Sequence, residues 1–189
     1  MAEKQPQAAF SALTKSLQCE WQFLQRVIPD CGSLFAPLDV VLTSVFLPAI
    51  FGSEVTPTER LLFSLPVRFG GLGVYRPHVT AGFSFAASMD ATRVIVEALH
   101  GLRPFEVDCH EATVLCAQKE FGNKNDLRNN ELISDVISQL DDLHRRCVER
   151  AKMNHLSGWL TVLPVGQNHF DLTAQEFVTL WHYVTESHF

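Results

Sequence analysis

The residues best suited to metal chemistry are two neighbouring aspartates. Asp141 and Asp142 form the only adjacent acidic pair in the chain, and paired carboxylates hold the two metal ions of polymerases and nucleases. Leu140 and Leu143 flank the pair on the apolar side of a segment with helical periodicity. The pattern therefore predicts that both carboxylates face solvent, and it supports no catalytic assignment.

A second candidate is the group formed by Cys109, His110 and Cys116. No pair in this group has the short spacing of a zinc knuckle, and a fourth ligand is not evident. His110 and Glu111 begin like a zincin helix, but Val114 stands where the second histidine is needed. The sequence predicts no metal site and no cofactor. Five scattered cysteines are typical of reduced thiols, which indicates an intracellular protein, cytoplasmic or nuclear.

A glycine-rich loop is the third candidate. Residues 65–74 read LPVRFGGLGV, which matches neither the dinucleotide fingerprint nor the phosphate-binding loop with its lysine. The nucleophile elbow G-x-S-x-G is also absent from the sequence. No side chain takes a catalytic role on this evidence, and the chain is not expected to be an enzyme.

Composition narrows the class of protein. The chain has 189 residues, 47% of them hydrophobic, and a net charge of −6. This size supports a real core in one domain or two small ones, and the acidic balance argues against a nucleic-acid coat protein or a membrane-surface binder. A local basic patch remains open. The most apolar stretch, residues 37–52, is shorter than the ~20 residues of a membrane span, so we expect a buried core helix and no membrane partner.

Apolar spacing predicts an all-α fold, an irregular multi-helix bundle with a glycine-rich loop. Two capping boxes, Thr56 with Glu59 and Thr173 with Glu176, mark helix starts. Pro48 is expected to kink or end its helix, and Gly122 to stop another. The predicted helices cover residues 6–28, 37–51, 57–63, 80–99, 107–121 and 132–151, followed by a last helix from about residue 174.

The loop and its neighbours are similar to a known family. The loop resembles the LPxRxGGLG segment that follows the polymerase core in retroelement (retrotransposon) reverse-transcriptase-like proteins. Upstream, WQFLQRVIP at 21–29, PL at 37–38 and FLPA at 46–49 resemble that family's thumb-like helices. Downstream, AAS at 86–88, GWL at 158–160, LP at 163–164, and Phe170, Leu172, Glu176 and Phe177 resemble its connector.

The resemblance implies two regions, a thumb-like helical region at 1–105 and a helical connector at 106–189, which could form one continuous domain. It also implies a non-catalytic middle piece of a longer protein, because the Tyr-x-Asp-Asp metal site of the palm is absent. A thumb grips primer-template nucleic acid through cations on phosphates. Arg60, Arg68 and Arg76 would make this weak backbone contact. The alternative for Arg68 is that it pins the loop to carbonyls or a carboxylate.

Two other functions stay open at this stage. One is an all-α interaction or scaffold module with a helical protein partner. Such a module would use the stripe from Ile133 to Cys147, for which packing inside the chain is favoured, or a C-terminal face with Phe177, Leu180 and Trp181. The other is a small helical enzyme with an unrecognised site.

Overall fold

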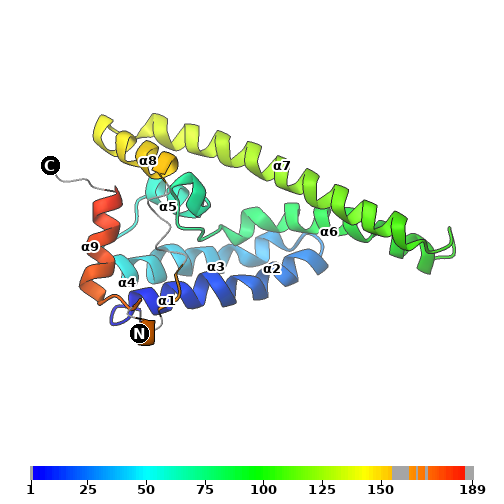
Figure 1. The fold of residues 1–189 in the computed structure, drawn as a ribbon, viewed down its shortest axis with the longest axis horizontal. Helices are drawn as coiled ribbons and strands as arrows, with labels where there is room; N and C mark the ends of the chain where they lie inside the picture. The colour runs from blue at the N-terminus through cyan, green and yellow to red at the C-terminus, as the bar shows by residue number, and fades with distance from the viewer. Residues whose placement is uncertain (1, 155–161, 165, 169, 186–189) are drawn as a thin grey trace.

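The structure is a computed structural model that describes residues 2–154, 162–164, 166–168 and 170–185. All regular elements in these residues are helices, and no strand occurs among them. This confirms the all-α prediction. Figure 1 shows an N-terminal pair of helical rods, then α6, then the long helix α7 on the far side of α6.

Two rods form the N-terminal part of the fold. Each combines α-helices with one wider π-helical turn, and Asp30 joins the rods in the left-handed region with φ 50°. The predicted end of the first rod near residue 28 is confirmed. The first rod is α1 (Pro6–Ala12), a π turn (Leu13–Leu17) and α2 (Gln18–Val27); the second is a 3-10 turn (Cys31–Phe35), α3 (Ala36–Val41), a π turn (Leu42–Phe46) and α4 (Leu47–Phe51).

Pro48 does not end the second rod, which continues to Phe51 and closes at Gly52 with φ 74°. Proline lacks an N–H, and its ring presses on the carbonyl four residues earlier, here that of Ser44. The π turn Leu42–Phe46 widens the helix at this point. The wider turn explains why the proline is tolerated, and the closure at Gly52 agrees with the prediction.

The second rod is longer and more exposed than predicted. It forms a helix of 21 residues, Cys31–Phe51, which by length and composition alone could cross a membrane, and only 28% of its most apolar window is buried. Leu34, Val40, Val41 and Val45 are exposed. The helix does reach the core, through Leu42, Leu47, Ile50 and Phe51, but the expectation that it is short and buried all round is wrong. The left-handed turn at Asp30 starts the helix upstream of Pro37.

α5 (Pro57–Ser64) begins at the predicted capping box. The backbone N–H of Glu59 donates to Thr56 Oγ1 at 3.2 Å, and the N–H of Thr56 donates to Glu59 Oε2 at 2.7 Å. After a 3-10 turn (Val67–Phe69) and the glycine loop, α6 runs over Pro77–Leu99. It begins before residue 80, since Pro77 supplies a good first helical position. It ends before Gly101, as predicted.

α7 (Val107–Gln139) corrects the prediction of two separate helices. Gly122 lies inside this 33-residue helix, at a cost of about 1 kcal/mol relative to alanine. Packing along α6 favours continuity; the Arg128 guanidinium lies 3.4 Å from the centre of the Phe83 ring. The chain breaks instead at Leu140, because the Asp141 carboxylate accepts the N–H of His144 at 2.9 Å and caps α8 (Asp142–Asn154). Both aspartates are exposed, as predicted.

The last helix, α9 (Ala174–Thr185), begins at the second capping box, where the N–H of Thr173 donates to Glu176 Oε2 at 2.8 Å. It follows a 3-10 turn (Gly166–Asn168). Phe177 packs against Phe10 of α1, with the ring centres 6.1 Å apart. The GWL segment at 158–160 and the side chain of Trp181 lie outside the described residues.

One core cluster draws on both predicted regions. Its members from beyond residue 105 are Ile133, Val136, Val148 and Phe177. The predicted stripe on the α7–α8 segment is therefore used inside the chain, except for exposed Leu143. The division at residue 105 stays a prediction; this boundary falls in the turn between α6 and α7.

Candidate functional site

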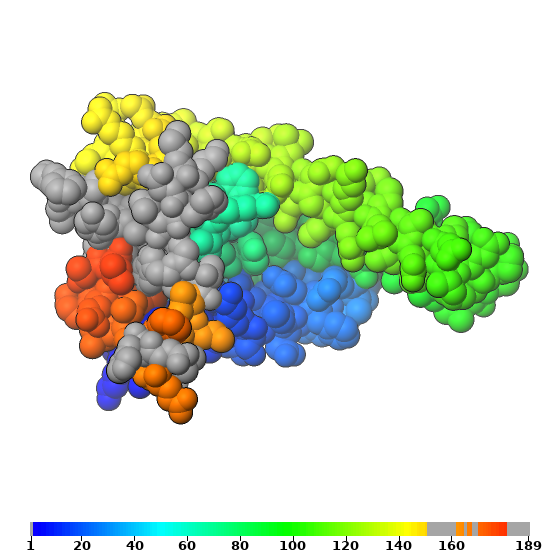
Figure 2. All heavy atoms as spheres, viewed as in Figure 1, coloured from blue at the N-terminus to red at the C-terminus, as the bar shows by residue number. Residues whose placement is uncertain are grey.

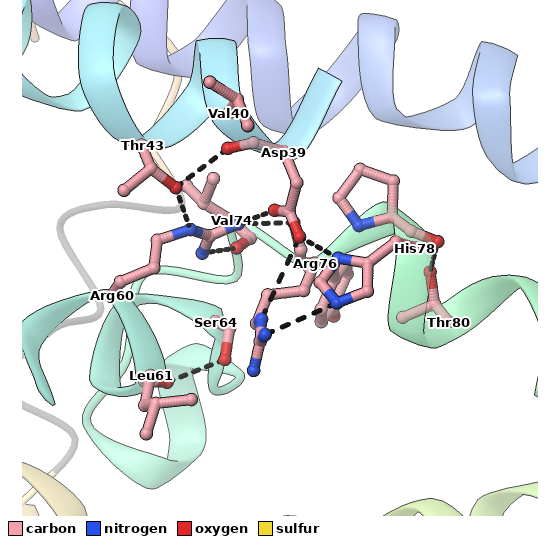
Figure 3. Close-up of polar contacts among 12 residues, drawn as sticks. Asp39, Val40, Thr43, Arg60, Leu61, Ser64, Val74, Arg76, His78 and Thr80 are labelled. Atoms are coloured by element: carbon pink, nitrogen blue, oxygen red, sulfur yellow. Dashed lines mark hydrogen bonds and ion pairs between the residues drawn. The ribbon is translucent and has the colours of Figure 1, made fainter. Parts of the chain in front are cut away.

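The densest polar cluster lies where α3, α5 and the start of α6 meet (Figure 3). Asp39 is the only charged residue of the second rod, and it is buried. Arg60 Nη2 donates to Asp39 Oδ1 at 2.8 Å, and His78 Nδ1 pairs with Oδ2. Arg76 Nε lies 3.9 Å from the same Oδ2. One carboxylate thus holds three basic side chains from two other parts of the chain.

Arg60 is almost fully occupied by protein acceptors. Its Nε donates to Thr43 Oγ1 at 3.0 Å, its Nη1 to the carbonyl of Val74 at 2.9 Å, and its Nη2 also to the carbonyl of Tyr75 at 3.2 Å. Burial lowers the pKa of the guanidinium, against the opposing effect of Asp39. With 6% of the residue exposed, Arg60 is not placed to bind phosphate, and the structure gives it a role in holding the loop after α5.

Arg68 and Arg76 are the more accessible members of the predicted trio. The Arg68 side chain is 56% exposed and pairs with Asp126 of α7. This contact is the carboxylate pin that the sequence offered as the alternative to phosphate binding. The Arg76 side chain is 34% exposed, and its Nη2 lies 3.4 Å from His78 Nε2. Arg76 and His78 therefore form the solvent edge of the cluster.

The glycine loop is packed into the core. Leu65, Leu72 and Val74 are buried, and the N–H groups of Gly73 and Val74 donate to the carbonyls of Leu65 and Phe63 at 2.8 Å and 3.0 Å. N–H groups that already donate to carbonyls of the chain are not available to bind a phosphate. The loop therefore fills part of the core with its apolar side chains.

Close approach explains why glycine stands at position 71. A Cβ there would lie 2.1 Å from the carbonyl oxygen of Leu65, far inside contact distance. Gln18 of α2 completes the packing, since its side chain donates to the carbonyl of Gly73 at 2.9 Å and accepts from the N–H of Tyr75 at 3.0 Å. The loop thereby joins the first rod to α5.

A shallow groove of about 390 Å³ lies between α6 and α7. Cys109 and Cys116 line it together with Asp90, Arg93, Thr113 and Glu120. At its end, Arg103 Nη2 donates to Cys109 Sγ at 2.9 Å and Nη1 to Glu97 at 3.2 Å. Within the described ranges, no three His, Cys, Asp or Glu side chains are grouped so that they could hold a metal ion.

Sequence reasoning missed Asp39, Thr43 and His78 as members of the cluster. One signal was present, because a single aspartate in an otherwise uncharged helix of 21 residues needs a cationic partner wherever the helix buries it. Compared with protein-family models, curated proteins and solved structures, the chain matches none of them.

Proposed function

We propose that the chain is a non-catalytic helical connector, a scaffold that holds other protein segments at its exposed apolar faces. The sequence resemblance to the thumb and connector region of reverse-transcriptase-like proteins agrees with this proposal. The observation that supports it is which side chains are buried and which are exposed. The buried residues of the glycine loop and of the Asp39 cluster serve the fold, whereas large apolar side chains remain exposed on the rods and along α6 and α7.

The exposed apolar side chains are numerous enough to suggest partners. Single exposed hydrophobic residues are ordinary, but contiguous apolar surface is typical of binding sites. On the second rod, Val41 and Val45 lie one helical turn apart, with Leu34 two turns before Val41. On α7, Leu115 and Leu127 are also more than half exposed. These faces fit a helical protein partner.

Site-specific photo-cross-linking tests the scaffold. A benzophenone amino acid placed at Val41, Val45, Leu115 or Leu127 should give adducts with one identified protein in cells, at one position or more. The same probe at exposed, polar Gln139 is the matched control. Adducts at none of the four apolar positions, or equal yields at Gln139, would refute the proposal.

A second candidate function is weak contact with a nucleic-acid backbone, which the exposure of Arg68 and Arg76 favours. Binding to a short RNA–DNA hybrid should weaken in the R68Q/R76Q variant, and the slope of log K against log salt should fall by about 0.7 to 0.9 for each phosphate that the variant no longer neutralises. Arg26 is exposed on α2, and among the described residues its side chain bonds only to the Gln22 carbonyl of its own helix, so R26Q supplies the control. Equal binding by both variants would exclude this role.

A further inference from the structure

The antiparallel pair of α6 and α7 forms an arm that projects beyond the two rods. Figure 1 shows the end of the pair clear of every other element, and Figure 2 shows the same end as a separate lobe of the surface. The turn at this end covers residues 100–106, between Leu99 and Val107. Side chains on this turn are therefore far from the buried core.

Four large apolar side chains crowd this tip. Leu99 is 82% exposed, Leu102 76%, Val107 57% and Phe105 51%. All four fall within nine consecutive positions at the end of the arm, where the Phe105 ring also packs on His110 with the ring centres 5.8 Å apart. Such a group is typical of a binding surface, because leaving this much apolar area in water is unfavourable.

Hydrogen bonds to both helices hold the turn at the tip. Gly101 adopts φ 70°, and the N–H groups of Gly101 and Leu102 donate to the carbonyls of Ala98 and Glu97 at 3.0 Å each. This is the Schellman closure of a helix end. Arg103 then ties the turn to Glu97 and to Cys109, on both helices. A surface ordered before binding loses less entropy when a partner docks.

Charge identifies the kind of partner. Glu106, Asp108 and Glu111 are exposed at the base of the tip, and no cation of the described chain pairs with them. The charge of Arg103 is offset by Glu97. An acidic rim disfavours nucleic acid and anionic lipid, and it would repel the tip of a second copy. It is complementary to a cationic rim.

We propose that the tip is a docking knob for a protein whose apolar pocket is rimmed by lysine or arginine. This rests on the proposed scaffold function and names the surface that carries it. Leu99 and Leu102 would enter the pocket, with Phe105 and Val107 beside them. Glu106 and Asp108 would meet the cationic rim.

Photo-cross-linking at Leu102 tests the knob in the full chain, with the partner identified by mass spectrometry and then purified. The affinity of the purified partner for the L99S/L102S variant should be at least about 10-fold lower than for the parent chain, which is the effect of replacing central residues of an interface. E106K/D108K should bind less tightly and lose the salt dependence of association. Because Leu99 and Leu102 are already exposed, L99S/L102S should keep the unfolding curve of the parent chain.

The outcomes separate the two proposals. Adducts at Val41 or Leu115 but none at Leu102 would overturn the knob and leave the scaffold standing. A Leu102 adduct with a second copy of the chain would also overturn it. So would tight, Leu102-dependent binding to phosphatidylcholine vesicles, because the occupant would then be a bilayer. No adducts anywhere would overturn both proposals.

Discussion

Arg60 and Asp39 form a buried ion pair across 21 positions of sequence, with Nη2 2.8 Å from Oδ1 and with side chains only 7% and 11% exposed. The pair fixes the helix α5 and the glycine loop against the second rod. Breaking it on one side leaves the other charge buried without a partner, which is far more costly than removing an exposed pair.

The first prediction concerns this pair. Asp39→Asn and Arg60→Gln should each lower the free energy of unfolding by about 3 to 5 kcal/mol. The exposed pair of Arg68 and Asp126 supplies the control, since Asp126→Asn should cost less than about 1 kcal/mol. Urea unfolding followed by circular dichroism measures both. Equal destabilisation in D39N and D126N would show that the cluster does not support the fold.

A second prediction compares two glycines. Gly71→Ala should strongly destabilise the chain, because its Cβ would lie 2.1 Å from the Leu65 carbonyl oxygen and the obstacle is backbone. At Gly122, inside α7, nothing lies within 4 Å of an added Cβ. Gly122→Ala should therefore stabilise the chain by up to about 1 kcal/mol. Thermal unfolding should move in opposite directions for the two variants, and a shared direction would refute the packing described for the loop.

A third prediction concerns pH at the start of α9. Hydrogen bonds from the backbone and side chain of Thr173 lower the pKa of Glu176 below its ordinary value of 4.5. A carboxyl whose pKa is lower in the folded state stabilises the fold above its ordinary pKa, and that contribution is lost as pH falls through the lowered value. Thr173→Ala should raise the pKa of Glu176 towards 4.5. A carboxyl NMR titration checks this, and an unchanged midpoint would contradict the capping box.

The fourth prediction concerns the contact between the two ends of the fold. Phe177 is 1% exposed and packs on Phe10, so Phe177→Ala should cost about 3 to 5 kcal/mol. Leu180 on the same helix is 37% exposed, and Leu180→Ala should cost clearly less. If F177A unfolded α9 alone, amide exchange would rise only there. A rise that reaches α1 would show that α9 and α1 share one cooperative unit.

The two capping boxes predicted the helix starts that follow them. Thr56 with Glu59 and Thr173 with Glu176 lie within one turn, so their contacts depend only on nearby residues. The stop predicted at Gly122 failed because packing against α6 outweighs a modest local cost. The cluster at Asp39 could not be assembled from the sequence, since its partners come from separate elements. The resemblance suggested three arginines for contact with a nucleic-acid backbone. In the structure Arg60 is buried, whereas Arg68 and Arg76 reach solvent.

The helix α7 runs without a break from the tip of the arm to Leu140. At a rise of 1.5 Å per residue, a helix the length of α7 spans about 50 Å, and its base is held where α5 packs beside it. A rotation of only about 5° at that base would carry the far end through about 4 Å, judged from the same length. A partner bound at the tip would therefore be displaced when a small rearrangement occurs at the base of the arm.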